Sequence, residues 1–276
     1  MAFPAAGSAR NPEDENNSAG HVLIDGVSHS FPGGKGGSVT QAVVDFSLDI
    51  DAGSFVCLLG PSGCGKSTLL NLVAGFERPE KGRILVGGRP VTGPGPDRGI
   101  VFQGANLLPW RSVLKNITLG PELAGRAREE TLTAAHRFIK LTGLEGFENH
   151  APYELSGGMR QRVALARAWI TEPPILLMDE PFGALDAQTR LSMQELLTSI
   201  RQITGATVFF VTHDVDEALF LADKIVVMTP RPGRIRQEIP VPFPRPREYE
   251  RVILDPAYVT LKHDILCAIR EPCYEI

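Results

Sequence analysis

The stretch that decides the fold runs from an apolar segment into a glycine-rich loop: Ser54-Phe55-Val56-Cys57-Leu58-Leu59, then Gly60-Pro61-Ser62-Gly63-Cys64-Gly65-Lys66-Ser67. The apolar segment is too short for a helix and apolar on both faces, which is typical of a central strand in a parallel sheet. The residues that follow, Thr68-Leu69-Leu70-Asn71-Leu72-Val73-Ala74, have helical spacing. A strand, a G-x-x-x-x-G-K-[ST] loop and a helix in this order predict a phosphate-binding loop.

The residue types of this loop suit the phosphates of a nucleotide. Glycines let backbone N–H groups curl around a phosphate without a Cβ in the way, and the helix N-terminus adds unpaired N–H groups. We expect the Lys66 ammonium to lie on the β- and γ-phosphate oxygens and the Ser67 hydroxyl to bind Mg²⁺. The expected cofactors are therefore ATP and Mg²⁺, and the loop residues expected to bind ATP are Gly60, Pro61, Ser62, Gly63, Cys64, Gly65, Lys66, Ser67 and Thr68.

A second apolar run ends in two acids: Pro174-Ile175-Leu176-Leu177-Met178-Asp179-Glu180. At the carboxyl end of a parallel strand these side chains emerge at the same sheet edge as the phosphate loop. We expect Asp179 to hold Mg²⁺ through its hydration shell and Glu180 to polarise the attacking water. His213 ends a later apolar run at the same edge, where it can reach a γ-phosphate.

The remaining pattern predicts an α/β fold with a mostly parallel core sheet. Residues 21–24 and 41–50 alternate as in an antiparallel β region, with a glycine-rich turn at 33–37 between them. Further buried-strand runs at 175–178, 207–211 and 224–228 are separated by helical patterns at 188–203 and 214–222. Only helical spacing is found between these blocks, at 129–141 and 159–170, which predicts an inserted helical subdomain over about 104–172.

The two ends of the sequence differ from this central part. Residues 1–20 are rich in Asn, Glu, Ser and Pro and are expected to be a disordered tail. We assign residues 21–240 to one ATPase domain and residues 241–276 to a C-terminal extension. Prolines interrupt regular patterns after position 229, so we expect at most a short strand at 235–239 and a final helix over 259–269.

Composition narrows the classes of function. The 276 residues include 28 Lys and Arg against 32 Asp and Glu, a net charge of −4, so no basic field points to nucleic acid. The four cysteines, Cys57, Cys64, Cys267 and Cys273, have neither disulfide-framework nor zinc spacing, which fits a reducing compartment. We find neither a signal peptide nor a run of about 18–20 apolar residues that could cross a bilayer. We therefore expect a cytoplasmic location.

With these motifs in place, the sequence resembles the ATP-binding subunit of an ABC transporter over residues 21–239. Leu155-Ser156-Gly157-Gly158-Met159-Arg160-Gln161-Arg162 is similar to the family signature. The resemblance implies that Ser156, Gly157 and Gly158 contact the γ-phosphate of ATP held by a second subunit, in a head-to-tail dimer. One position departs from the pattern, because Met159 stands where the family most often has Gln. We expect ATPase activity to survive this change, because the backbone and Ser156 would make the phosphate contacts.

The resemblance places four other residues. Phe31 falls where the family has the aromatic ring that stacks on adenine, and Gln103 where it has a glutamine that binds Mg²⁺ and links the subdomains. Asp186 lies in the segment that crosses the dimer interface, and His213 matches the switch histidine. Catalysis is thus assigned to Glu180 and His213, and the metal to Ser67, Gln103 and Asp179.

Two further stretches indicate a branch of the family. Leu107-Leu108-Pro109-Trp110-Arg111-Ser112-Val113 and Thr229-Pro230-Arg231-Pro232-Gly233-Arg234-Ile235 resemble subunits for the import of taurine, aliphatic sulfonates, nitrate or bicarbonate. Residues 60–76 and 93–103 are most like taurine-type subunits. The partners this implies are a second ATPase subunit, two transmembrane permease subunits and a periplasmic or extracellular solute-binding protein. The chain would be peripheral, on the cytoplasmic face of the (inner) cell membrane.

Two alternatives stay open at this point. A soluble ABC ATPase of translation or DNA repair usually has two cassettes or long coiled-coil insertions, which this sequence lacks. A P-loop kinase for a small molecule would need neither the signature at 155–159 nor the segment Ala184-Leu185-Asp186. Co-purification from membranes separates the transporter from both alternatives.

Overall fold

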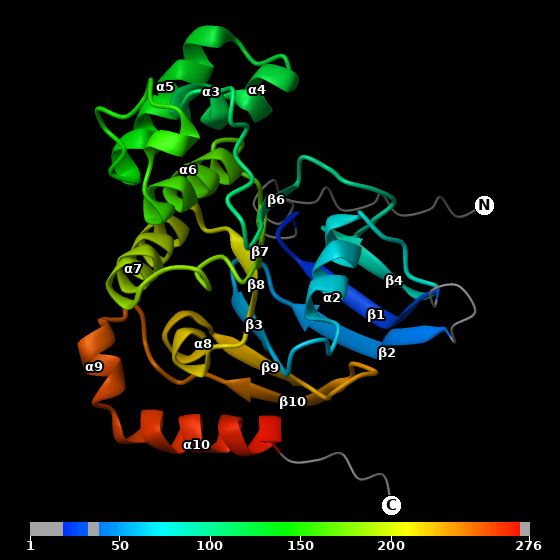
Figure 1. Ribbon diagram of the computed structural model, residues 1–276. Coiled ribbons are helices and arrows are strands. Elements are labelled where there is room, and N and C mark those ends of the chain that lie inside the picture. Colours follow the sequence, from blue (N-terminus) through cyan, green and yellow to red (C-terminus); the bar gives the residue numbers. More distant parts are fainter. Residues whose placement is uncertain (1–18, 33–38, 271–276) are drawn as a thin grey trace, which may run out of the picture.

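The computed structural model describes residues 19–32 and 39–270 and contains a six-stranded and a four-stranded β-sheet with helices around them (Figure 1). The larger sheet has the order β10-β9-β3-β8-β7-β6, and all neighbours are parallel except β10, which is antiparallel to β9. Its strands are β3 (Phe55–Leu59), β6 (Arg98–Val101), β7 (Ile175–Asp179), β8 (Thr207–Thr212), β9 (Lys224–Met228) and β10 (Ile235–Pro240). The mixed α/β fold predicted from the sequence is thereby confirmed.

The central strands are buried on both faces, which explains their unbroken apolar sequences. Every residue of β3 and of β8 is buried. Successive side chains of a strand point to opposite faces, so Val56 and Leu58 face one side of the sheet and Phe55, Cys57 and Leu59 the other. The first side is covered by α2 (Lys66–Ala74) and the smaller sheet. The second is covered by α6 (Gly157–Trp169), α7 (Ala187–Thr204) and α8 (Val215–Leu221).

The smaller sheet is antiparallel, with the order β2-β1-β4-β5. Its strands are β1 (Val22–Phe31), β2 (Thr40–Ile50), β4 (Lys81–Val86) and β5 (Arg89–Pro90). Phe31 pairs with Thr40 at the end of this ladder, and both line one cavity with Lys66, the first residue of α2. The predicted turn at 33–37 and nearly all of the predicted tail at 1–20 lie outside the described residues.

Three strands were missed by the sequence analysis. The first half of β4 is exposed, so its pattern lacks the alternation that marks a half-buried strand, and β5 has only two residues. β6 is a four-residue edge strand preceded by a glycine- and proline-rich segment, too short for a periodicity. Its place in the parallel sheet is nevertheless important, because Gln103 follows it.

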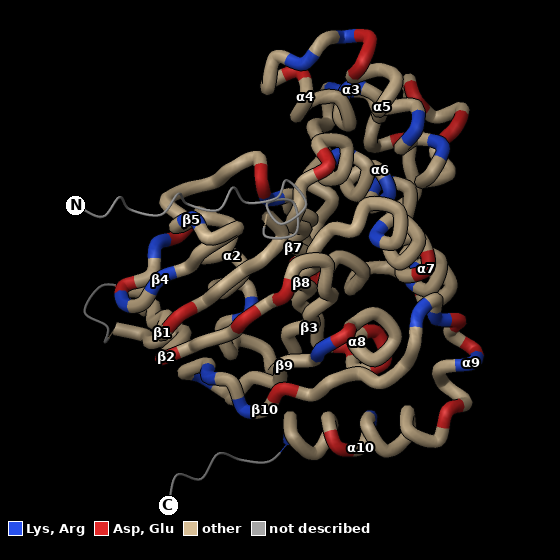
Figure 2. The backbone as a smooth tube through the Cα atoms, turned by 180° about the vertical axis from the view of Figure 1, so that it is seen from behind, with Lys and Arg blue, Asp and Glu red and all other residues tan. Residues whose placement is uncertain are grey.

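The helices between β6 and β7 form a lobe on one side of the larger sheet (Figure 1). They are α3 (Val113–Ile117), α4 (Leu119–Leu123), α5 (Arg128–Leu141), a 3-10 turn (Pro152–Glu154) and α6. Figure 2 shows acidic and basic positions intermingled along this lobe and α7. Within residues 19–32 and 39–270, no helix combines the length and apolar character needed to cross a bilayer.

The chain after β10 returns to the body of the protein. A short helix, α9 (Tyr249–Ile253), was not predicted, because the prolines before it conceal its pattern. The last helix, α10 (Pro256–Arg270), begins three residues earlier than the predicted 259–269. It packs beneath α8, where Tyr258 donates a hydrogen bond to Asp216 and Lys262 forms an ion pair with the same carboxylate at 2.6 Å (Figure 1).

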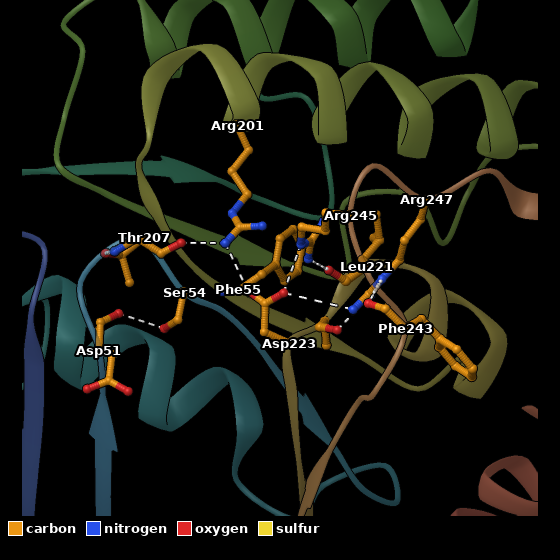
Figure 3. Close-up of polar contacts among 12 residues, drawn as sticks. Asp51, Ser54, Phe55, Arg201, Thr207, Leu221, Asp223, Phe243, Arg245 and Arg247 are labelled. Carbon is orange, nitrogen blue, oxygen red and sulfur yellow. Dashed lines mark hydrogen bonds and ion pairs between the residues drawn. The ribbon is translucent and has the colours of Figure 1, made fainter. Parts of the chain in front are cut away.

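A cluster of arginines fastens this returning segment (Figure 3). Arg201 from α7 and Arg245 from the segment after β10 each bind Asp223 at 2.8 Å. Arg247, whose side chain is 1% exposed, donates to the carbonyls of Phe220, Ala222 and Phe243 at 2.9, 2.7 and 3.0 Å. The segment is therefore joined to the end of α8 and the start of β9 by charge-assisted hydrogen bonds.

Candidate nucleotide site

The glycine-rich loop borders a cavity of about 430 Å³, a volume typical of small-ligand sites. The loop joins β3 to α2, so it lies at the carboxyl edge of the parallel sheet. Of the expected loop residues, Ser62, Gly63, Gly65, Lys66, Ser67 and Thr68 line the cavity, whereas Gly60, Pro61 and Cys64 do not. Phe31 and Glu180 also line it. One cavity thus collects the predicted adenine-stacking ring, most of the phosphate loop and the predicted catalytic acid.

The loop's conformation depends on glycine at two positions. Gly63 and Gly65 have φ values of 77° and 106°, in the region that side chains rarely adopt. A Cβ on Gly65 would lie 2.8 Å from the carbonyl oxygen of Ala42, so β2 leaves no room for one. The two glycines therefore keep the loop close to β2 and leave its backbone without side chains at the start of α2.

Lys66 is buried in the loop, where its ammonium is held by backbone carbonyls. Its side chain is buried, and its ammonium donates to the carbonyls of Gly60 and Pro61 at 2.9 and 3.1 Å. Cys64 is 1% exposed and packs against Met228, with its Sγ 3.9 Å from the Met228 Sδ. Burial raises the pKa of the Cys64 thiol, against the opposing charge of Lys66. The thiol therefore fills space behind the loop.

The two acids at the end of β7, Asp179 and Glu180, lie at the same edge and face different neighbours. Ser67 donates a hydrogen bond to Asp179 at 3.1 Å, which joins the loop to the acidic strand. Burial raises the pKa of Asp179, the hydrogen bond from Ser67 partly offsets the rise, and the charge of Glu180 adds to it. A hydroxyl beside a carboxylate is the hard oxygen donor set that Mg²⁺ prefers.

The backbone of Glu180 has an unusual conformation. Its φ of 42° is uncommon for a residue with a Cβ, and its N–H is held by the carbonyl of Val211 at 2.9 Å. The Glu180 carboxylate lies 3.0 Å from Nδ1 of His213, which is 60% exposed. The two residues assigned to catalysis are therefore in contact.

Gln103 lies beside this pair. A Cβ on Gly183 would be 4.0 Å from both the Gln103 Nε2 and the Glu180 Oε2, so the amide is near the acid. Gln103 is exposed and does not line the cavity of the loop. The structure thus brings it to the acidic edge of the site.

The signature residues lie apart from this cavity. Ser156 caps α6 and accepts a hydrogen bond from the Met159 N–H at 3.2 Å. Gly157 faces Leu185, with an added Cβ 4.0 Å from its side chain, and Asp186 caps the adjoining α7 through the Thr189 N–H at 3.0 Å. Ser156, Gly157, Gly158 and Asp186 are absent from the cavity's lining. Within one chain, these residues do not reach the loop's own nucleotide site.

Three cavity residues were not assigned to the site from the sequence: Thr40, Ala42 and Arg231. Thr40 and Ala42 carry no chemical signal, because their place follows from the pairing of β1 with β2. Arg231 stood in a quoted stretch, where it served only to indicate a branch. Arg231 is far from the loop in sequence, so nothing in the sequence indicated that the two lie together in the structure.

Comparisons with known proteins agree with this geometry. Residues 43–183 match the family model described as ABC transporter. This chain belongs to the ABC transporter family. An uncharacterised ABC transporter ATP-binding protein of Methanocaldococcus jannaschii is 48% identical over 242 residues, covering 85% of this ABC chain and 89% of its relative. A taurine import ATP-binding protein of Rhizobium johnstonii is 54% identical over 209 residues, 76% of this chain and 80% of that one.

Solved structures place the ABC chain with the ATPase cassettes. The dimeric structure of a bacterial ABC transporter cassette has a TM-score of 0.72 and 33% identity, covering 80% of this chain and 99% of that one. A dimeric cassette in a post-hydrolysis state, bound to ADP and Pi, has a TM-score of 0.71 and the same identity and coverage. The chain is accordingly an ATP-binding, ATP-hydrolysing subunit, and neither the repair ATPase nor the kinase is favoured.

Proposed function

We propose that this chain supplies the ATP hydrolysis for import of a small anionic or zwitterionic solute, such as taurine, another aliphatic sulfonate, nitrate or bicarbonate. The observation that carries the proposal is the division of the chain into two anion-binding edges, the loop cavity and the signature at Ser156. A chain with two such edges is complete only when another copy faces it. The name of the taurine import relative supports this class of solute.

The site residues would divide the work at the loop cavity. The backbone of the loop and Lys66 bind the phosphates, and Phe31 stacks on the adenine. Mg²⁺ would be held by Ser67, Asp179 and Gln103, where it would neutralise charge on the β- and γ-phosphates. The contact of Ser67 with Asp179 at 3.1 Å supports this set.

Glu180 and His213 would act on the water and the γ-phosphate. Glu180 accepts a proton from the attacking water, because its carboxylate stands at the edge of the cavity. His213, whose Nδ1 lies 3.0 Å from that carboxylate, would contact the γ-phosphate. Loss of the γ-phosphate removes its contacts with His213 and with the partner's signature, so hydrolysis opens the dimer.

A second copy of the chain would complete each site. In a head-to-tail pair, Ser156, Gly157 and Gly158 of one copy contact the γ-phosphate bound by the other, and Asp186 crosses the interface. The exposure of Ser156 and Gly157 at the N-terminus of α6 supports this arrangement. The dimeric forms of both similar cassettes support it further.

The helical lobe would carry the motion to two permease subunits. Arg167 of α6 donates to the carbonyls of Ala105 and Asn106, both at 2.8 Å, so the segment after Gln103 moves with the signature helix. Beyond it, Trp110 is 77% exposed. An exposed indole suits a pocket for a short helix of a membrane partner. The chain would then be peripheral, at the cytoplasmic face, and the permease would receive solute from a separate binding protein.

Uptake in cells tests this function. Cells that lack the chain should fail to take up radiolabelled taurine or another sulfonate, and the wild-type chain should restore uptake. The Glu180→Gln variant should not restore it, because the base is lost. Glu195→Gln provides the matched control, since Glu195 is an exposed residue of α7 outside the site. Restoration by Glu180→Gln would contradict the assigned role, and normal uptake of all four solutes without the chain would contradict the proposed import.

A further inference from the structure

We propose that Arg231 is a further nucleotide-binding residue, whose guanidinium contacts the polyphosphate of ATP or ADP beside Gly63 of the loop. The inference rests on ATP binding at the loop cavity and adds a residue to it. Arg231 comes from the turn between β9 and β10, far in sequence from the loop.

The turn that carries Arg231 is closed by its own hydrogen bonds. The Thr229 hydroxyl donates to the carbonyl of Pro232 at 3.1 Å and accepts from the Arg234 N–H at 3.0 Å. The Thr229 N–H also donates to the Arg234 carbonyl at 3.0 Å. These bonds hold the backbone on both sides of Arg231.

The same turn is docked on the nucleotide site. Gly233 donates to the Ala42 carbonyl at 2.9 Å and accepts from the Val44 N–H at 3.1 Å, so the turn pairs side by side with β2, whose Thr40 and Ala42 line the cavity. A Cβ on Gly233 would lie 2.1 Å from the carbonyl oxygen of Cys64, a separation that real structures do not allow. Glycine at this position therefore permits the turn to touch the phosphate loop directly.

The docked turn brings the side chain of Arg231 to the cavity. Its Nε donates to the Gly63 carbonyl at 3.0 Å, and the side chain lines the cavity with Lys66. Across the described ranges, no carboxylate forms an ion pair with it. Its positive charge also lowers the pKa of the Cys64 thiol, a smaller effect than burial, so its field reaches the loop.

This geometry suits a polyanion better than a purine. A guanidinium with one edge held by a carbonyl keeps its other N–H groups for the cavity, and a planar fork matches phosphate oxygens. Lys66 supplies a buried point charge from within the loop, whereas Arg231 supplies an exposed one from outside. Arg231 should therefore strengthen the binding of ATP and ADP alike and leave the hydrolytic step unchanged.

Competition binding tests the assignment. A fluorescent ATP analogue bound to the full chain is displaced with ATP, with ADP and with inorganic tripolyphosphate. In Arg231→Gln the Kd of all three should rise by about tenfold, the effect of one charge-assisted hydrogen bond at an exposed site. Arg231→Lys should recover part of the loss, and added salt should shrink the difference from wild type. In the assembled transporter, KM for ATP should rise while kcat stays unchanged.

The same turn offers a matched control, Arg234→Gln, because Arg234 is exposed and does not line the cavity. Three unchanged Kd values for Arg231→Gln would overturn the proposal. So would weaker binding of ATP with unchanged tripolyphosphate, since that result would place Arg231 on the base. If the wild-type chain bound no ATP, the proposed function would fail instead, which keeps the two failures distinct.

Discussion

Replacing Arg247 with Ala should destabilise the fold, although Arg247 does not line the nucleotide cavity. Burial and the neighbouring Arg245 lower the pKa of Arg247 to about 10, so the side chain remains cationic at neutral pH. Its guanidinium is 1% exposed and binds three backbone carbonyls at 2.7, 2.9 and 3.0 Å. Alanine would leave these carbonyls, at the end of α8 and in the returning segment, without their donor.

The size of the effect follows from these bonds. A hydrogen bond that involves a charged group contributes about 1.5–3 kcal/mol, so three give roughly 4.5–9 kcal/mol as an upper bound. Water can reach some carbonyls after the truncation, and the cost of burying the charge is relieved. We therefore expect the free energy of unfolding to fall by about 3–5 kcal/mol. At about 2–4 °C per kcal/mol for a large domain, the melting temperature should fall by roughly 6–20 °C.

Thermal and urea unfolding followed by circular dichroism measure this loss. Arg251→Ala is the control, because Arg251 is 80% exposed and pairs with Glu248 at the surface. It should change the free energy of unfolding by less than about 0.5 kcal/mol. A melting temperature for Arg247→Ala within about 2 °C of wild type would refute the reasoning, because the three carbonyl bonds would then contribute nothing net.

Three other predictions concern the nucleotide site. Lys66→Ala should abolish ATP binding in a fluorescent-analogue titration, because it removes the buried charge within the loop, for which the exposed Arg231 does not substitute. Unchanged affinity would contradict the placement of ATP at the loop. Met159→Gln should change the ATPase rate by less than about tenfold, or 1.4 kcal/mol. Position 159 contacts Ser156 through its backbone N–H, at 3.2 Å, and the substitution keeps that group. A larger change would assign a catalytic role to the side chain. Glu180→Gln should lower hydrolysis by roughly 10²–10⁴ while ATP affinity is kept. Size-exclusion chromatography with ATP should then show dimer in place of monomer, and a wild-type hydrolysis rate would exclude Glu180 as the base.

The sequence predicted the parts of the fold whose signals are local. β3, the loop and α2 follow one another along the chain, and burial on both faces gives β3 an unbroken apolar run. β4 and β6 were missed, because an exposed half-strand and a short edge strand have no such run. The helix α9 was missed for a related reason, since the prolines before it dominate the local pattern.

The site residues that could be predicted from the sequence are those whose chemical type and motif indicate a role. Lys66, Asp179 and Glu180 stand in motifs, and the structure brings all three to one edge. Arg231 could not be placed, because its position depends on the backbone contacts of Gly233 with β2, and pairing between distant segments has no signature in the turn's own residues. The role of Arg247 was hidden in the same way.

The pairing of Tyr258 and Lys262 with Asp216 has a consequence for hybrid proteins. Asp216 lies in the first turn of α8, three residues after His213, so α10 is bonded to the helix that begins beside His213. Exchanging the C-terminal segment between two relatives would therefore change what supports the histidine, unless α8 is exchanged with it. A junction placed before β8 keeps these elements from one parent, whereas a junction at the end of β10 divides them. In a hybrid protein, the last helix and His213 should therefore come from the same parent.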